Sequence, residues 1–122
     1  MKMIFSAKEH EIFINFEEEI SSKSLFWHKK CIEKASLNNK LNVILNFEHV
    51  ETFSNSLVDF ILAIKKITNQ INICNLNTTL LPVVYLMQLD KEVKIYTSEY
   101  DAKTQTKPII KRRFKLVSKN AF

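Results

Sequence analysis

The chain has 122 residues, of which 46% are apolar, so one globular domain with a buried core is expected and a disordered chain is excluded. Glycine is absent from the sequence. This excludes a glycine-rich phosphate loop, a dinucleotide-binding fingerprint and a nucleophile elbow, because each of them requires glycine. The formal net charge is +5, but residues 103–122 hold seven bases and no acid, so the rest of the chain is slightly acidic.

The sequence shows no sign of a membrane-spanning or secretory segment. No apolar run approaches the ~20 residues that a transmembrane helix needs, and the first residues lack the apolar core of a signal peptide. Cys31 and Cys74 lack the spacing of metal ligands, which is typical of reduced cysteines in a cytoplasmic protein. His10, His28 and His49 show no ligand spacing either, so we expect no metal, no cofactor and no enzymatic activity.

Two short strands, over 3–6 and 11–16, open the chain. In the second, Ile12, Ile14 and Phe16 recur at the period of two that a half-buried strand requires. A helix over 23–36 follows, and Ser21 or Ser22 can cap it. Its expected apolar face consists of Leu25, Trp27, Cys31, Ile32 and Ala35.

Residues 41–66 are the most strongly patterned part of the chain. A nearly continuous apolar run over 43–47 predicts a central strand covered on both faces. A turn and a helix over 56–69 follow, and the helix carries two apolar rows. One helix rarely buries both rows against its own sheet, so we expect part of this surface to contact a partner. The first row is Leu57, Phe60, Ile61, Ile64 and Ile67, and the second is Val58 and Leu62.

The remaining elements complete an alternating pattern. A strand over 71–76 precedes a helix that Asn77, Thr78 or Thr79 can cap and that runs to residue 89. A strand over 93–96 and a last helical turn to residue 102 follow. The order β-β-α-β-α-β-α-β-α predicts an α/β fold with a mixed sheet of about five strands and about four helices. We expect the domain to span 1–102 and the basic C-terminal tail to span 103–122.

Three short stretches carry a resemblance to a known family. Residues 46–58 read NFEHVETFSNSLV, 75–77 read NLN, and 86–91 read LMQLDK ahead of Ile95 and Tyr96. In order and spacing they resemble the STAS domain, whose pattern runs D-L-S-x-V-x-x-I-D-S-S-G-L, then N-L-S, L-x-x-x-G-L-D-K and I-Y. The resemblance covers about four-fifths of the chain and implies a STAS-like fold. This sequence departs from the pattern at Asn46, Ser54, Asn55, Leu57 and Gln88, which stand for Asp, Asp, Ser, Gly and Gly.

The resemblance also implies a regulated serine. In anti-sigma-factor antagonists of this family, a serine in the turn before the helix is phosphorylated by a kinase that is itself the anti-sigma factor. Ser56 matches a serine position and is the phosphorylation candidate, with Ser54 second. Ser56 is also suited to capping the helix, because Ser56 and Asp59 fit a capping box with Asp in place of Glu. The expected partner-docking residues are Ser54, Asn55, Ser56, Leu57, Val58, Asp59 and Leu62.

Two functions stay open at this point. The first is partner switching as an anti-sigma-factor antagonist-like module, bound to an anti-sigma factor or a serine kinase of that type. The second is a cytoplasmic accessory subunit of an ABC-type lipid transporter, bound to the ATPase subunit. The basic tail, with Lys111, Arg112, Arg113 and Lys115, suits contact with an anionic membrane surface, an added sheet strand or simple exposure. Nucleic-acid binding through the tail is the weakest of its interpretations.

Overall fold

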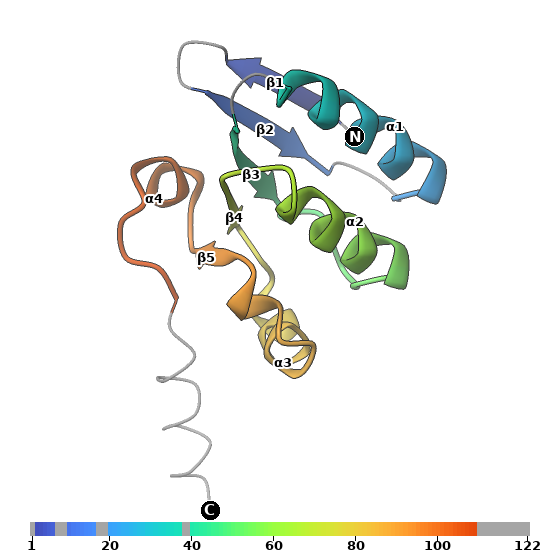
Figure 1. The fold of residues 1–122 in the computed structure, drawn as a ribbon. Coiled ribbons are helices and arrows are strands. Elements are labelled where there is room, and N and C mark those ends of the chain that lie inside the picture. The colour runs from blue at the N-terminus through green and yellow to red at the C-terminus, as the bar shows by residue number, and fades with distance from the viewer. Residues whose placement is uncertain (1, 7–9, 17–19, 38–39, 110–122) are drawn as a thin grey trace, which may run out of the picture.

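A computed structural model of the chain describes residues 2–6, 10–16, 20–37 and 40–109, and a five-stranded sheet lies at its centre (Figure 1). The strands follow the chain in the spatial order β1-β2-β3-β4-β5. β1 pairs antiparallel with β2, and the other three pairs are parallel. The strands are β1 (Lys2–Ser6), β2 (Glu11–Asn15), β3 (Asn42–Asn46), β4 (Gln70–Cys74) and β5 (Lys94–Tyr96). The predicted α/β fold with a mixed sheet is confirmed.

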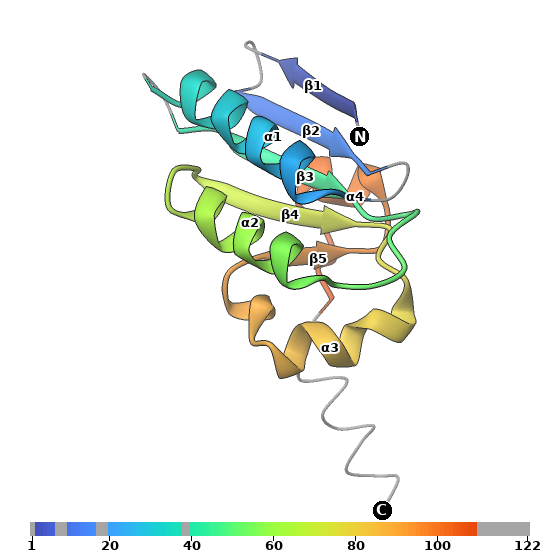
Figure 2. The same ribbon diagram turned by 90° about the vertical axis from the view of Figure 1, so that its right-hand side faces the viewer.

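Helices cover both faces of this sheet. Helices α1 (Ser22–Ala35) and α2 (Asn55–Lys65) lie side by side on one face, and α4 (Glu99–Thr104) lies on the other (Figures 1 and 2). Helix α3 (Leu81–Leu86) lies near the β5 edge, between the 3₁₀ turns η1 (Thr78–Leu80) and η2 (Leu89–Lys91). In α1, α2 and α4 a serine hydroxyl accepts a hydrogen bond from the first turn, so local sequence fixes where these helices begin. The capping serines are Ser21 for α1, Ser54 for α2 and Ser98 for α4.

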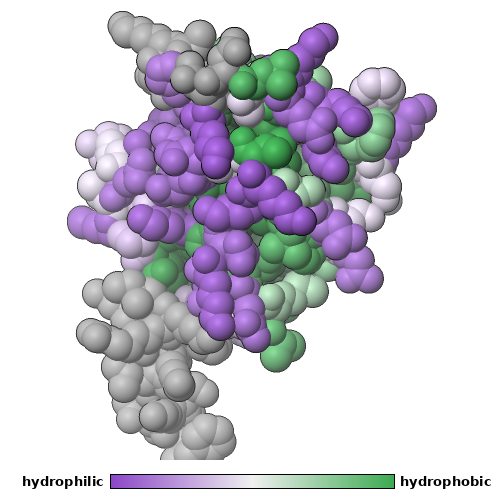
Figure 3. Space-filling model, in the orientation of Figure 1, coloured by the Kyte–Doolittle hydropathy of each residue, from purple (hydrophilic) through white to green (hydrophobic). Residues whose placement is uncertain are grey.

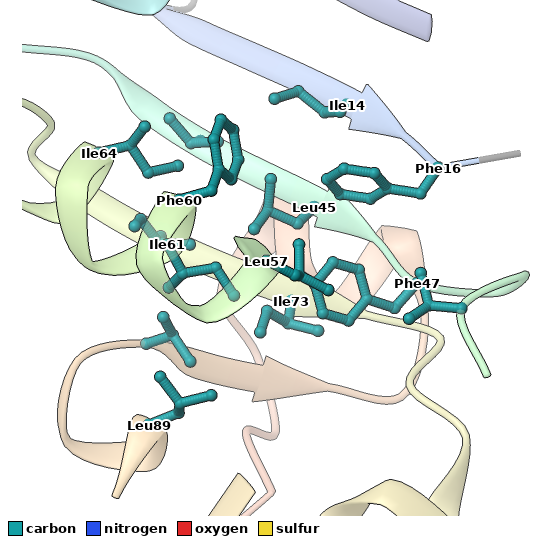
Figure 4. Packing of buried hydrophobic residues seen from close by; sticks show 14 of the residues in the cluster. Ile14, Phe16, Leu45, Phe47, Leu57, Phe60, Ile61, Ile64, Ile73 and Leu89 are labelled. Carbon is teal, nitrogen blue, oxygen red and sulfur yellow. The ribbon is translucent and has the colours of Figure 1, made fainter. Parts of the chain in front are cut away.

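The main core lies between the sheet and helices α1 and α2. Ile12, Ile14 and Phe16 are at most 1% exposed, which confirms the alternation seen in the sequence. Leu57, Phe60, Ile61 and Ile64 project from α2 toward β3 and β4 (Figure 4). A smaller cluster on the opposite face places Ala102 of α4 against Ile44, Cys74 and Tyr96. β3 is therefore covered on both faces, as its continuous apolar run predicted.

Several boundaries differ from the sequence-based expectation. Helix α2 ends at Lys65 instead of residue 69, and β4 ends at Cys74 instead of residue 76. The helix expected to reach residue 89 ends at Leu86, because Gln88 adopts a left-handed conformation with φ of 60° and caps the separate turn η2. The folded part of the chain also continues past residue 102. Helix α4 ends at Thr104, and the backbone N–H of Ile109 donates to the carbonyl of Ile95 at 2.7 Å. The residues of the basic tail from Lys111 to Lys115 lie outside the described part of the chain.

Candidate functional site

The turn between β3 and α2 is fixed by Ser54. Its Oγ accepts a hydrogen bond from the backbone N–H of Leu57 at 3.1 Å, and its carbonyl accepts from Val58 at 3.1 Å. Ser54 has extended backbone angles, whereas Asn55 and Ser56 are already helical. The capping box predicted at Ser56 is therefore wrong, since Ser54 caps α2 and the helix begins at Asn55.

Ser56 lies in the first turn of α2 and faces helix α1. Its Oγ is 2.9 Å from the Oγ of Ser22, the first residue of α1, and one hydroxyl donates to the other. The Ser56 side chain is half-buried, while Ser54 and Asn55 are exposed. The hydroxyl that the sequence marks as the phosphorylation candidate thus already has a hydrogen-bond partner on a neighbouring helix.

A shallow groove of about 320 Å³ runs between α1 and α2 beside this serine pair. Leu25 and Phe60 supply buried apolar surface to it, and Phe26 supplies exposed apolar surface. Lys29 and Asp59 add one charge of each sign. An apolar groove with a few polar groups at its margin suits the side chains of a docked protein better than it suits a substrate undergoing chemistry.

The predicted docking residues divide by exposure. Ser54, Asn55 and Asp59 are exposed, and Leu62 is 39% exposed on the next turn. Val58 is half-buried and packs against the core. Leu57 is 0% exposed and points toward the sheet among Leu45, Phe47 and Ile73, so its inclusion among the docking residues is corrected (Figure 4). Leu57 stands where the STAS pattern has Gly, and its side chain fills the core and leaves no surface for a partner.

A chain of asparagines joins the carboxyl ends of three strands behind the turn. Asn46 donates from Nδ2 to Oδ1 of Asn15 at 3.2 Å, and its own Oδ1 accepts from Asn75 Nδ2 at 3.0 Å. The same oxygen accepts from the backbone N–H of Glu48 at 3.1 Å. Asn46 is 8% exposed, so these bonds satisfy a nearly buried amide. The Asn46 amide, which stands where the STAS pattern has Asp, therefore holds the start of the 47–54 segment to the sheet.

The described residues offer no catalytic constellation. Burial raises the pKa of the Cys74 thiol to about 12, and Glu99 and Glu48 add to the effect, so this cysteine stays protonated and unreactive at neutral pH. Among the residues that the structure describes, no group of three or more His, Cys, Asp or Glu side chains could hold a metal ion. No helix in the described ranges has the length and apolar character needed to cross a bilayer.

The apolar face expected for the first helix needs a correction. Leu25 and Ile32 are buried, but Trp27 is 58% exposed and Cys31 is exposed. Phe26 is not included in the predicted apolar face, and its 52% exposure agrees with that omission. Leu25 and Ile32 are seven positions apart and define the buried side, and Trp27 is two positions, or about 200°, from Leu25 on a helical wheel. That offset is the signal that would have placed Trp27 outside.

Two solved structures are similar to this chain. The NMR structure of the protein TM1081 matches with a TM-score of 0.69 and 20% sequence identity, over 86% of this chain and 88% of that chain. The structure of an anti-sigma-factor antagonist (STAS) domain protein from Planctomyces limnophilus matches with a TM-score of 0.65 and 15% identity, over 85% and 95%. No protein-family model matches the sequence, and no match was found among curated proteins. The sequence motifs and the structural likeness agree, and this chain has the fold of a STAS domain.

Proposed function

We propose that this chain is a non-catalytic protein-binding module of the anti-sigma-factor antagonist type, working in the cytoplasm. The observation that carries the proposal is the exposed turn at Ser54 and Asn55, which leads into an open groove beside the first turns of α1 and α2. A solved structure similar to this chain is that of an anti-sigma-factor antagonist (STAS) domain protein. The partner is an anti-sigma factor, or a serine kinase of that type, that covers Ser54, Asn55, Asp59 and Leu62.

Phosphorylation of Ser56 is the proposed means of releasing that partner. The N-terminal turn of a helix stabilises a phosphate, because backbone N–H groups and the helix dipole both point toward it. Lys29 lines the same groove and can pair with the phosphate, whereas Asp59 repels it. A phosphate also replaces the Ser56 hydroxyl that contacts Ser22 and adds about two negative charges to a surface that the partner must desolvate. The phosphorylated chain therefore releases the partner.

The test uses immobilised full-length chain carrying wild-type Ser56, Ser56→Ala or Ser56→Glu, with lysate of the source cells from which ATP has been removed. We expect the native and Ser56→Ala chains to retain the same partner and Ser56→Glu to lose it. Mass spectrometry should find phosphate on Ser56 only after incubation with the partner and ATP, with Ser54→Ala as the matched control that leaves Ser56 available. Equal recovery by all three chains would refute the switch and leave docking standing. Absence of any common partner would refute both.

A second function, an accessory subunit of an ABC-type lipid transporter, is favoured by one observation. The Ser56 hydroxyl is half-buried and already bonded to Ser22, as suits a docking surface that never needs modification. The partner in that case is the ATPase subunit, and Leu62 and Asp59 belong to the same interface. Co-purification of the chain with membrane-bound ATPase subunits, insensitive to Ser56→Ala, would support this function. Co-purification with a soluble kinase would count against it.

A further inference from the structure

Helix α1 carries a stripe of basic and aromatic side chains on its outer side. It consists of Lys23, Phe26, Trp27, Lys30 and Lys34, which recur at helical spacing and are all exposed. Phe26 and Trp27 expose 52% and 58% of their surface. We call these five residues the α1 stripe. The view in Figure 3 likewise shows apolar areas interleaved with polar surface on the outside of the molecule.

The aromatic pair at the centre of the stripe is held in place by local contacts. The rings of Phe26 and Trp27 meet edge to face, with centroids 5.8 Å apart. The ammonium of Lys30 lies 5.4 Å from the centroid of the Phe26 ring. The rings are therefore arranged on the surface before anything binds, and a ligand has little side-chain ordering to do.

The stripe itself carries charge of one sign, because three of its five residues are lysines and none is acidic. Helix α1 contains four lysines and one acid, Glu33. The Glu33 carboxylate lies 3.9 Å from Nζ of Lys29 and 3.7 Å from Nζ of Lys30. Lys23 and Lys34, at the two ends of the helix, have no carboxylate partner among the described residues. The surface is thus complementary to a negatively charged one.

We propose that the α1 stripe binds the surface of a membrane that contains anionic lipid. All its cations are lysines, which are depleted from protein interfaces but extend their ammonium groups to lipid head groups while their methylene stems lie in the interface. Tryptophan concentrates at the same depth of a bilayer, and basic helices with Trp and Phe lie flat on anionic membranes. The proposal does not depend on the partner proposed for α2, although Phe26 also lines the groove between the helices.

Trp27 is the only tryptophan in the chain, so its fluorescence reports directly on the stripe. We expect the full-length chain to show a blue shift of Trp27 emission with vesicles of equal parts phosphatidylcholine and phosphatidylglycerol, and none with phosphatidylcholine alone. Added salt should reverse the shift, because the attraction is screened. Lys23→Gln combined with Lys34→Gln should weaken partitioning about 25-fold, at about fivefold per lysine. Lys94→Gln, the same change at the one exposed residue of β5, an edge strand of the sheet, is the matched control and should have no effect.

The basic tail could bring the chain to vesicles by itself, and the same measurement separates the two routes. If the chain floats with anionic vesicles while Trp27 emission stays unchanged, the tail is the anchor and the proposal is refuted. An unchanged emission shift in the Lys23→Gln, Lys34→Gln double variant refutes it as well. If the chain binds neither kind of vesicle, the membrane proposal is refuted, and an acidic protein becomes the expected partner of the stripe. Replacing Lys111, Arg112 and Arg113 by Gln should preserve the shift if the stripe is the anchor.

Discussion

The hydroxyls of Ser22 and Ser56 lie 2.9 Å apart and join the first turns of α1 and α2, although the two residues are 34 positions apart in the sequence. Ser56 directly precedes the buried Leu57, and Ser22 shares the first turn of α1 with the buried Leu25. The contact therefore lies beside the packed face of both helices. The bond is a direct side-chain link between the N-terminal turns of the two helices.

The Ser22–Ser56 bond should appear as a coupling energy in a double-mutant cycle. Ser22→Ala and Ser56→Ala each remove the bond, so the double variant should lose less stability than the sum of the single losses. For a neutral, partly exposed hydrogen bond we expect a coupling of about 0.5–1 kcal/mol. Urea unfolding of the four chains measures it. Strict additivity would show that the two hydroxyls contribute independently.

Ser54 should contribute more to stability than Ser56, because it caps the helix. Ser54→Ala leaves the N–H of Leu57 without its side-chain acceptor and should lower the free energy of unfolding by ~1 kcal/mol. Ser54→Asp keeps an acceptor at the cap and should retain most of that stability. Urea unfolding compares both with the native chain. If Ser56→Ala were the more damaging of the two alanine variants, the assignment of the cap to Ser54 would be untenable.

The amide of Asn46 should stabilise the fold through its three hydrogen bonds. Asn46→Ala leaves the N–H of Glu48 and the amide of Asn75 without their acceptor in a nearly buried place. We expect a loss of about 1–3 kcal/mol in the free energy of unfolding. Asn42→Ala, which removes one exposed bond to Asn69 at the other end of β3, is the control and should cost less. A similar loss of unfolding free energy in both variants would mean that the three bonds of Asn46 stabilise the fold no more than the single exposed bond of Asn42.

Much of the fold could be predicted from the sequence because local pattern and tertiary environment agree. Ile12, Ile14 and Phe16 alternate and are buried, and the unbroken apolar run of β3 is covered on both faces. The order of helices and strands then left few arrangements for the sheet. The structural likeness to an anti-sigma-factor antagonist (STAS) domain protein agrees with the motif order.

The details of the site could not be read in the same way. Ser54 and Ser56 are both serines ahead of an apolar run, and only the backbone angles decide which one caps the helix. The helix break at Gln88 could not be predicted from a glycine, because the sequence has none. A non-glycine residue takes the φ of 60° that glycine adopts most easily. The bond between Ser22 and Ser56 depends on how two helices lie side by side, which no local pattern encodes.

Cys74 should make the fold less stable at alkaline pH. Burial raises the pKa of its thiol from 9.0 to about 12, so between these values the unfolded chain loses a proton that the native chain keeps. The native state then binds more protons than the unfolded state, and the free energy of unfolding falls as pH rises, by up to about 1.4 kcal/mol per pH unit. Urea unfolding from pH 8.5 to 10.5, the range over which the thiol of the unfolded chain ionises, should show a shallower fall in Cys74→Ala.

Reaction with a thiol reagent gives an independent check on the same cysteine. At pH 8 the native chain should react once, at exposed Cys31, and the unfolded chain should react at both cysteines. Rapid reaction of Cys74 in the native chain would contradict the protonated, buried thiol described for β4.

Leu57 and Leu62 should separate stability from binding on the same helix. Leu57 is 0% exposed, so Leu57→Ala leaves a cavity in the core and should cost about 2–5 kcal/mol of unfolding free energy. Leu62 is 39% exposed, so Leu62→Ala should change stability by at most about 0.5 kcal/mol. If α2 docks a partner as proposed, Leu62→Ala should nevertheless reduce partner recovery severalfold, whereas a Leu57→Ala chain that remains folded should recover it normally. Thermal unfolding and quantitative pull-down of the two variants provide both readouts. Loss of binding in Leu57→Ala at a temperature where circular dichroism shows it folded, with full binding in Leu62→Ala, would reverse the assignment of the docking surface.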